Sequence, residues 1–212
     1  MTPSKTIARL SIYRRTLWQM RSEGIVSVFS HQLAARAGAT AAQVRRDLMT
    51  VGYEGSPQRG YGVDGLLAAI EACLDPEELQ PVALVGVGNL GRAVLAFLRG
   101  RRPKLAITAA FDRDPELIGR MVHGCPVYGM DQLAGVLAAQ GITVAVIAVP
   151  AGNAQTVATE LMGAGVKGLI NFAPARINVG KGIIVEDIDM TTALEKVAYF
   201  ARQSTAKEEV RQ

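Results

Sequence analysis

The chain has 212 residues, enough for one sizeable core or two small ones, and we expect two domains. Its 49% hydrophobic and 20% charged residues exclude a disordered or a fibrous protein. No run approaches the roughly 20 apolar residues of a membrane span, and no apolar signal-peptide core begins the chain, so we expect a cytoplasmic protein without a membrane partner.

The net charge of +4 is unevenly placed. Residues 1–60 carry nine Lys and Arg side chains against three Asp and Glu. Such a segment is expected where a protein meets a polyphosphate, although a solvated surface has the same composition. Cys73 and Cys125 are too few for a disulfide framework and lack the spacing of metal ligands, so we expect no metal site.

The first fifty residues predict three helices. The first covers residues 4–23, the second runs from an N-cap at Ser30 to Gly38, and the third starts after a cap at Thr40. The apolar face of the first comprises Ile7, Leu10, Leu17 and Met20, with Trp18 alongside. Two short helices joined by a Gly-Ala-Thr turn indicate a helix-turn-helix.

The third helix has the pattern of a recognition helix. Val44 and Leu48 lie one turn apart and face inward. The side chains left on the outer surface are Gln43, Arg45, Arg46 and Asp47. Arginines there suit insertion into the major groove of double-stranded DNA, and their other interpretation is a solvated basic surface.

A Gly-rich stretch, YEGSPQRGYGV at residues 53–63, has the composition of a hairpin wing. We assign Arg59, Gly60 and Tyr61 to DNA contact, with the arginine reaching the minor groove. The first 80 residues therefore predict a winged helix-turn-helix domain, ending in a helix at 64–74 and the charged connector DPEELQP.

After this boundary, short apolar runs alternate with helical segments, which predicts an α/β domain with a Rossmann-type doubly wound parallel sheet over residues 81–190. The predicted strands are 82–86, 105–111, 143–149, 166–170 and 183–187, and the predicted helices are 89–99, 131–140 and 154–163. Residues 191–212 form a C-terminal helix with one apolar stripe, followed by a tail.

The segment VALVGVGNLGR at residues 82–92 carries the dinucleotide fingerprint. Gly86, Gly88 and Gly91 form G-x-G-x-x-G directly after a strand and at the start of a helix. Asp112 follows roughly 20 residues later, where a carboxylate would accept hydrogen bonds from the adenosine ribose. It would repel a 2′-phosphate, so we expect NADH and NAD+, although Arg113 keeps NADP(H) open. The site includes the loop residues Val87, Asn89 and Leu90.

Other ligand positions lie at the carboxyl ends of the later strands. Val149 and Pro150 end one predicted strand, and Asn171 ends another. The amide of Asn171 suits either a nicotinamide carboxamide or a loop cap.

A hydride-transfer enzyme needs a proton donor near the nicotinamide, most often a histidine. The chain has only His31, in the predicted helix-turn-helix, and His123, in a loop without an evident partner. This inventory indicates sensing rather than catalysis, and we expect no enzyme and no catalytic residue.

With these parts in this order, the chain resembles the redox-sensing transcriptional repressor family Rex. The segments that carry the resemblance are ARLSIYRR, QVRRDL, GVGNLGRA, FDRDPELIG, VKGLINFAPA and VEDIDM. The resemblance implies a homodimer with a domain-swapped C-terminal helix, which represses genes of fermentative or anaerobic respiratory metabolism. NADH would release it from operator DNA, and NAD+ would compete without releasing it.

The resemblance also implies a polar switch formed by an arginine, a tyrosine and an aspartate. By position these fall on Arg15, Phe97 and Asp189, and Met190 stands where the family has a large apolar residue near the nicotinamide. Phe97 departs from the pattern because it cannot form the hydrogen bond, which leaves a pair of Arg15 and Asp189. The alternative interpretation is that Phe97 belongs to the core of the first Rossmann helix. The wing sequence also departs from the family pattern, which is compatible with an altered operator preference.

Two alternatives stay open. A small NAD-dependent oxidoreductase would leave the basic N-terminal domain unexplained. A CoA-binding module like that of the succinyl-CoA synthetase family shares the sheet topology, and Asp112 weighs against it.

Overall fold

The computed structural model describes residues 3–101 and 104–209. The chain divides between Glu77 and Glu78 into two compact units, and each is described by itself. Within the described residues, no helix is both long and apolar enough to cross a membrane.

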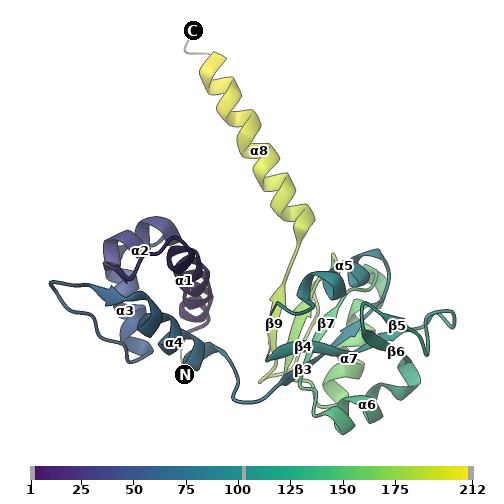
Figure 1. Ribbon diagram of the computed structural model, residues 1–212. Helices are drawn as coiled ribbons and strands as arrows, with labels where there is room; N and C mark the ends of the chain where they lie inside the picture. Colours follow the sequence, from purple (N-terminus) through teal and green to yellow (C-terminus); the bar gives the residue numbers. More distant parts are fainter. Residues whose placement is uncertain (1–2, 102–103, 210–212) are drawn as a thin grey trace. The chain divides into compact units, whose positions relative to one another are not determined.

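The first unit is a winged helix-turn-helix, as predicted (Figure 1). Its elements are α1 (Ser4–Ser22), β1 (Ser27–Val28), α2 (Ser30–Ala37), α3 (Ala41–Thr50), β2 (Tyr61–Gly62) and α4 (Val63–Leu74). Leu10, Leu17, Leu33, Val44, Leu48 and Ile70 are among the side chains of its core. The helices therefore close around one small apolar core.

Local signals set the ends of the two middle helices. Gly38 ends α2 in the left-handed conformation, with φ of 65°. Thr40 and Gln43 form a reciprocal capping box at the start of α3: the backbone N–H of Gln43 donates to Thr40 Oγ1 at 3.2 Å, and that of Thr40 donates to Gln43 Oε1 at 2.9 Å. Both expectations are confirmed.

Three expectations for this unit were wrong. Ser30 is the first residue of α2 rather than its N-cap, because the side chain of Gln32 accepts from the backbone N–H of Phe29 instead. Ile7 on α1 is 37% exposed and lies outside the core, whereas Tyr13, which was not expected there, is fully buried in it. Asp47 is 2% exposed rather than on the outer surface of α3.

The second unit contains a seven-stranded sheet in the order β5-β6-β4-β3-β7-β8-β9, with only β5 and β6 antiparallel. The strands are β3 (Gln80–Val85), β4 (Leu105–Asp112), β5 (Met121–Val122), β6 (Cys125–Gly129), β7 (Val144–Ile147), β8 (Gly168–Asn171) and β9 (Ile184–Asp187). The order from β6 to β9 is that of a dinucleotide-binding Rossmann sheet, which confirms the predicted fold class.

Helices cover both faces of this sheet (Figure 1). α5 (Asn89–Leu98) packs with Val94 and Leu95 against one face. The other face is covered by α6 (Leu133–Gln140), which follows the short η1 (Met130–Gln132), and by α7 (Ala151–Gly163). α7 starts three residues earlier than expected, directly after Pro150.

The hairpin of β5 and β6 was not predicted. His123 stands at its turn with a positive φ of 49°, next to Gly124. β6 reads CPVYG, and the proline within this short run hid the strand, although only the alternate residues Cys125, Val127 and Gly129 are buried.

The C-terminal helix α8 spans Met190–Glu209, which confirms the predicted C-terminal helix. Its apolar stripe is exposed within the single chain: Leu194 is 70% exposed and Val197 is 66% exposed. The predicted domain swap stays a prediction.

Candidate dinucleotide and DNA sites

The three glycines of the fingerprint have different surroundings. Gly86 has φ of 97°, and a Cβ there would approach the carbonyl oxygen of Ala148 to 2.5 Å. A Cβ on Gly91 would overlap the carbonyl oxygen of Gly86. A Cβ on Gly88 would have no protein atom within 4 Å. Two glycines therefore permit the turn and its packing, and Gly88 leaves the loop open to a ligand at the N-terminus of α5, where backbone N–H groups favour phosphate.

Asp112 ends β4 beside this loop. Its Oδ2 accepts from the backbone N–H of Val87 at 2.6 Å, and its Oδ1 accepts from the backbone N–H groups of Arg113 at 2.7 Å and Asp114 at 3.0 Å. A carboxylate offers about four lone-pair positions, so these three bonds orient the group and leave one for a ribose hydroxyl. Asp112 both holds the loop and faces the ligand side.

A cavity of about 300 Å³ opens between the loop and the ends of the neighbouring strands. Its lining includes six predicted residues: Gly86, Gly88, Asp112, Arg113, Val149 and Pro150. Val87, Asn89, Leu90 and Gly91 continue the loop into the first turns of α5. Met130 and Asn153 also line the cavity, and neither was predicted. Met130 follows β6, so recognising that strand would have found it, and Asn153 lies in the first turn after Pro150.

Asn171 is 1% exposed, and its amide binds both the loop that follows it and the neighbouring strand β9. Its Nδ2 donates to the carbonyl of Ala175 and to Asp187 Oδ1, both at 2.8 Å, and its Oδ1 accepts from the backbone N–H of Ala173 at 3.1 Å. These contacts have the form of a loop cap, the alternative interpretation of this residue. Its role in nucleotide binding stays a prediction.

The candidate DNA surface lies on α3. Arg45 and Arg46 are both exposed, and Arg45 Nη1 donates to Ser30 Oγ at the start of α2 at 3.0 Å. Gln43 is exposed too, but its amide oxygen serves the capping box. The helix therefore presents two guanidinium groups, one of them held against the preceding helix.

The candidate wing is a closed turn. Ser56 and Gly60 exchange two backbone hydrogen bonds at 2.8 and 2.7 Å, and β2 pairs with β1 through Val28 and Tyr61. Gly60 is buried with φ of 70°, and a Cβ there would approach the carbonyl oxygen of Val28 to 2.6 Å. Glycine is therefore required at Gly60, and the exposed Arg59 is held at the tip of the turn.

The four candidate switch residues divide between the units. Arg15 is exposed on α1 in the first unit. In the second unit, Asp189 caps α8: its carboxylate accepts from the backbone N–H and the hydroxyl of Thr192 at 2.9 and 2.6 Å. These bonds lower the pKa of Asp189. Phe97 is 59% exposed, so the alternative that it belongs to the helix core is wrong. The guanidinium carbon of Arg101 lies 3.9 Å from the centre of the Phe97 ring, and Met190 is also 59% exposed.

Among the described residues, no three His, Cys, Asp or Glu side chains are grouped in a way that could hold a metal ion.

The two units define a class of protein that joins a winged helix-turn-helix to a Rossmann domain. Two family models match in the same order: "Putative DNA-binding protein N-terminus" over residues 2–48 and "CoA binding domain" over residues 77–175.

The redox-sensing transcriptional repressor Rex of Lactobacillus gasseri is 38% identical over 198 residues, which cover 93% of this chain and 92% of the relative. The Rex of Anoxybacillus flavithermus is 39% identical over 200 residues, 94% of each chain. This chain belongs to the Rex family of redox-sensing transcriptional repressors.

Solved structures of a Rex-family repressor called RSP share the fold over the full length. Its complex with NAD+ and operator DNA has a TM-score of 0.88 at 26% identity and covers 100% of this chain and 97% of that one. Its complex with NADH has a TM-score of 0.85 at 25% identity and covers 99% of each.

Proposed function

We propose that the protein is a transcriptional repressor that senses the ratio of NADH to NAD+. It binds operator DNA when NADH is low and leaves the DNA when NADH binds. One observation carries the proposal: a single chain holds both an outward-facing basic recognition helix and a glycine loop tied to a strand-end carboxylate, Asp112. The repressor RSP, of similar fold, has been crystallised with NADH and with NAD+ and operator DNA.

The residues of the second unit fit a dinucleotide. The open space at Gly88 admits a pyrophosphate to the N-terminus of α5, and the remaining lone pair of Asp112 suits a ribose hydroxyl. NADH supplies a neutral dihydronicotinamide ring where NAD+ supplies a cationic one, and a weakly polar pocket favours the neutral ring. Release from DNA requires that NADH bind the non-DNA-binding state more tightly.

The DNA side rests on Arg45, Arg46 and Arg59. We propose that the two exposed arginines of α3 contact guanine edges or phosphates in the major groove and that the exposed arginine of the wing enters the minor groove. Gln43, Gly60 and Tyr61 support them as cap and wing residues.

The first test is fluorescence anisotropy with an inverted-repeat operator duplex of the Rex type at fixed salt. NADH should release the protein, and NAD+ and NADPH should not. Asp112→Asn should lose the response to NADH, while Asp114→Asn, on the same loop but exposed, is the matched control. Tight binding that ignores NADH in the wild type would contradict the sensing proposal, and no operator binding would contradict the repressor proposal.

The alternatives are separate outcomes of the same test. Because the family model "CoA binding domain" matches residues 77–175, CoA should be titrated beside NADH. Tight binding of CoA without binding of NADH would favour the CoA-binding module. Turnover of NADH with a simple substrate would favour an oxidoreductase. We propose instead that the protein is not an enzyme and works in the bacterial cytoplasm, where operator DNA and NADH are both present.

We propose that the switch consists of two polar residues instead of three, Arg15 of one subunit and Asp189 of the other. Phe97 and Met190 would be their apolar neighbours. Phe97 has no hydroxyl to join the pair, so NADH should change operator affinity less than in a three-member switch. Phe97→Tyr restores the hydroxyl and should increase the NADH-dependent change in affinity, measured by the anisotropy titration. An unchanged response would remove Phe97 from the switch.

We also propose a homodimer in which α8 swaps into the partner. The support is the exposed stripe of Leu194 and Val197, since a helix with so much exposed apolar surface needs a covering partner. A dimer would also match the two halves of an inverted-repeat operator.

A further inference from the structure

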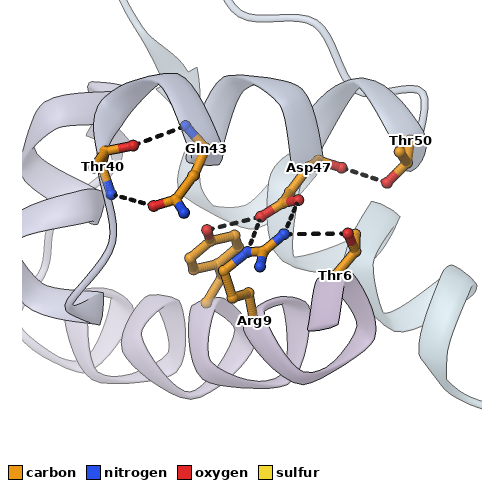
Figure 2. Close-up of polar contacts among 7 residues, drawn as sticks. Thr6, Arg9, Thr40, Gln43, Asp47 and Thr50 are labelled. Atoms are coloured by element: carbon orange, nitrogen blue, oxygen red, sulfur yellow. Dashed lines mark hydrogen bonds and ion pairs between the residues drawn. The ribbon is translucent and has the colours of Figure 1, made fainter. Parts of the chain in front are cut away.

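The recognition helix contains one buried charge. Asp47 on α3 is 2% exposed, although its neighbour Arg46 is exposed and belongs to the candidate DNA surface. A buried carboxylate is unfavourable unless it is fully paired, so its contacts indicate what holds it there. Figure 2 shows these contacts.

Two side chains of α1, one turn apart, bind the Asp47 carboxylate (Figure 2). Arg9 binds both oxygens: its Nε donates to Oδ2 at 2.6 Å and its Nη2 to Oδ1 at 2.7 Å. The hydroxyl of Tyr13 donates to Oδ2 at 3.0 Å. Arg9 Nη2 also donates to Thr6 Oγ1 at 3.1 Å, which orients the guanidinium from the preceding turn of α1. Three positions on α1 thus hold one residue of α3.

The charges in this network agree with its geometry. Burial by itself would raise the pKa of Asp47, but the hydrogen bonds from Arg9 and Tyr13 outweigh burial and hold that pKa below its usual value. Asp47 raises the pKa of Arg9 in turn. Burial is the main cause that raises the pKa of Tyr13 to about 12, and the hydrogen bond to Asp47 is the second. The carboxylate, the guanidinium and the neutral phenol are therefore the stable forms near neutral pH.

Such a network does more to orient a helix than to stabilise it. A buried ion pair gains little over well-packed apolar side chains because both ions lose their hydration. A two-pronged guanidinium–carboxylate contact, however, allows one relative orientation, whereas apolar side chains can slide and repack. The Thr40–Gln43 capping box is local to the start of α3, whereas the bonds from Arg9 and Tyr13 tie the middle of α3 to α1. The apolar side chains Val44 and Leu48 turn α3 toward the core, and the directional bonds to Asp47 narrow the rotation of the helix about its axis.

We propose that Arg9 and Tyr13 are positioning residues for operator recognition, which act through Asp47 to set the rotation at which α3 presents Arg45 and Arg46 to DNA. The proposal rests on the proposed DNA-binding function and deepens it. A small rotation of α3 moves the arginine tips away from the base edges. Non-specific binding is less sensitive to such a displacement, because it depends mainly on the positive charge that meets the phosphates and carries no sequence information.

The test compares specific and non-specific DNA. The specific duplex is the sequence that the wild-type protein enriches from a random duplex pool, and the non-specific duplex has the same composition in scrambled order. The principal variant is the double change Arg9→Leu with Asp47→Leu, which removes both charges and leaves apolar side chains to pack. Thermal unfolding followed by circular dichroism establishes that each variant is folded.

The double variant should keep a melting temperature near or above that of the wild type, and should keep its affinity for the scrambled duplex. Its preference for the specific duplex should fall by about 10- to 100-fold, the loss expected for one or two misplaced base contacts. Tyr13→Phe removes one of the three hydrogen bonds and should cause a smaller loss. The matched control is Glu23→Gln with Arg36→Gln, which removes an exposed ion pair of the same unit, 2.7 Å long, and should leave the preference unchanged.

The outcomes separate the two proposals. A folded double variant that prefers the specific duplex as strongly as the wild type would overturn the positioning role and leave the repressor proposal intact. Equal loss of affinity for both duplexes would also overturn it, because that result indicates a structural role. If the wild type enriches no sequence, the DNA-binding function fails, and the positioning role with it.

Discussion

Gly88→Ala separates ligand binding from folding at the dinucleotide loop. Gly88 has φ of −68°, which alanine adopts without strain, and its Cβ would have no protein atom within 4 Å. The free energy of unfolding should therefore change by less than about 1 kcal/mol, and the change can be stabilising because alanine restricts the unfolded chain. The only space that the new methyl group takes is the space open to a ligand.

The expected loss of NADH affinity follows from that space. A pyrophosphate approaches the loop to receive hydrogen bonds from backbone N–H groups at the start of α5. Losing one hydrogen bond to a charged group costs about 1.5–3 kcal/mol, which corresponds to about 10- to 150-fold weaker binding. The operator affinity without NADH should stay at the wild-type value, because Gly88 lies in the second unit.

The assay pairs isothermal titration of NADH with urea unfolding. Gly91→Ala is the matched control, because its Cβ would overlap the carbonyl oxygen of Gly86 and should lower the stability of the second unit. If Gly88→Ala binds NADH like the wild type while remaining folded, the pyrophosphate does not approach this loop and the assignment of the site is wrong.

Three further outcomes are expected. Tyr13 is fully buried with its pKa raised to about 12, so the folded state keeps the phenol proton after the unfolded state loses it near pH 10. Stability is then lost as pH rises from about 10 to 12, and urea unfolding at pH 9 and pH 11.5 should show a loss larger in the wild type than in Tyr13→Phe by on the order of 2 kcal/mol. Asp75→Asn removes the counter-ion of Arg14, whose Nη1 lies 2.5 Å from Asp75 Oδ1. The Nε of Arg14 is buried and has no hydrogen-bond partner among the described residues. Since Asp75 is partly exposed, we expect a cost of about 1–3 kcal/mol in urea unfolding, against under about 1 kcal/mol for Asp64→Asn at the exposed pair with Arg21. Leu194→Glu charges the exposed stripe of α8 and should shift light scattering from dimer to monomer, and a persistent dimer would contradict the proposed swap.

Much of the fold was predictable because its signals are local. The capping box of Thr40 and Gln43 needs only two residues that are three positions apart. Gly38 ends its helix because glycine adopts the left-handed conformation without strain. The hydrophobic pattern also predicted the parallel strands β3, β4, β7, β8 and β9 of the second unit. It missed β6, where Pro126 and a short length concealed an alternating strand, and with it Met130 in the cavity lining.

The candidate site was predictable as residue types but not as contacts. The glycine spacing and the distance along the chain to Asp112 indicated a dinucleotide site. The bond from the backbone N–H of Val87 to Asp112, and the bond from Asn171 to Asp187 on β9, join residues that are far apart in the chain, so no local pattern in the sequence encodes them.

By itself the sequence determined the helix-turn-helix, the Rossmann alternation and the glycine loop, because each depends on periodicity or on residues close together in the chain. Only the tertiary structure decided the place of Asp47. A helical pattern treats an aspartate beside two arginines as a surface residue, and the favourable partners Arg9 and Tyr13 lie on another helix, 38 and 34 positions away in the sequence. Burial of a charge depends on what folding brings to meet it, and that is a property of the packed chain rather than of any local segment.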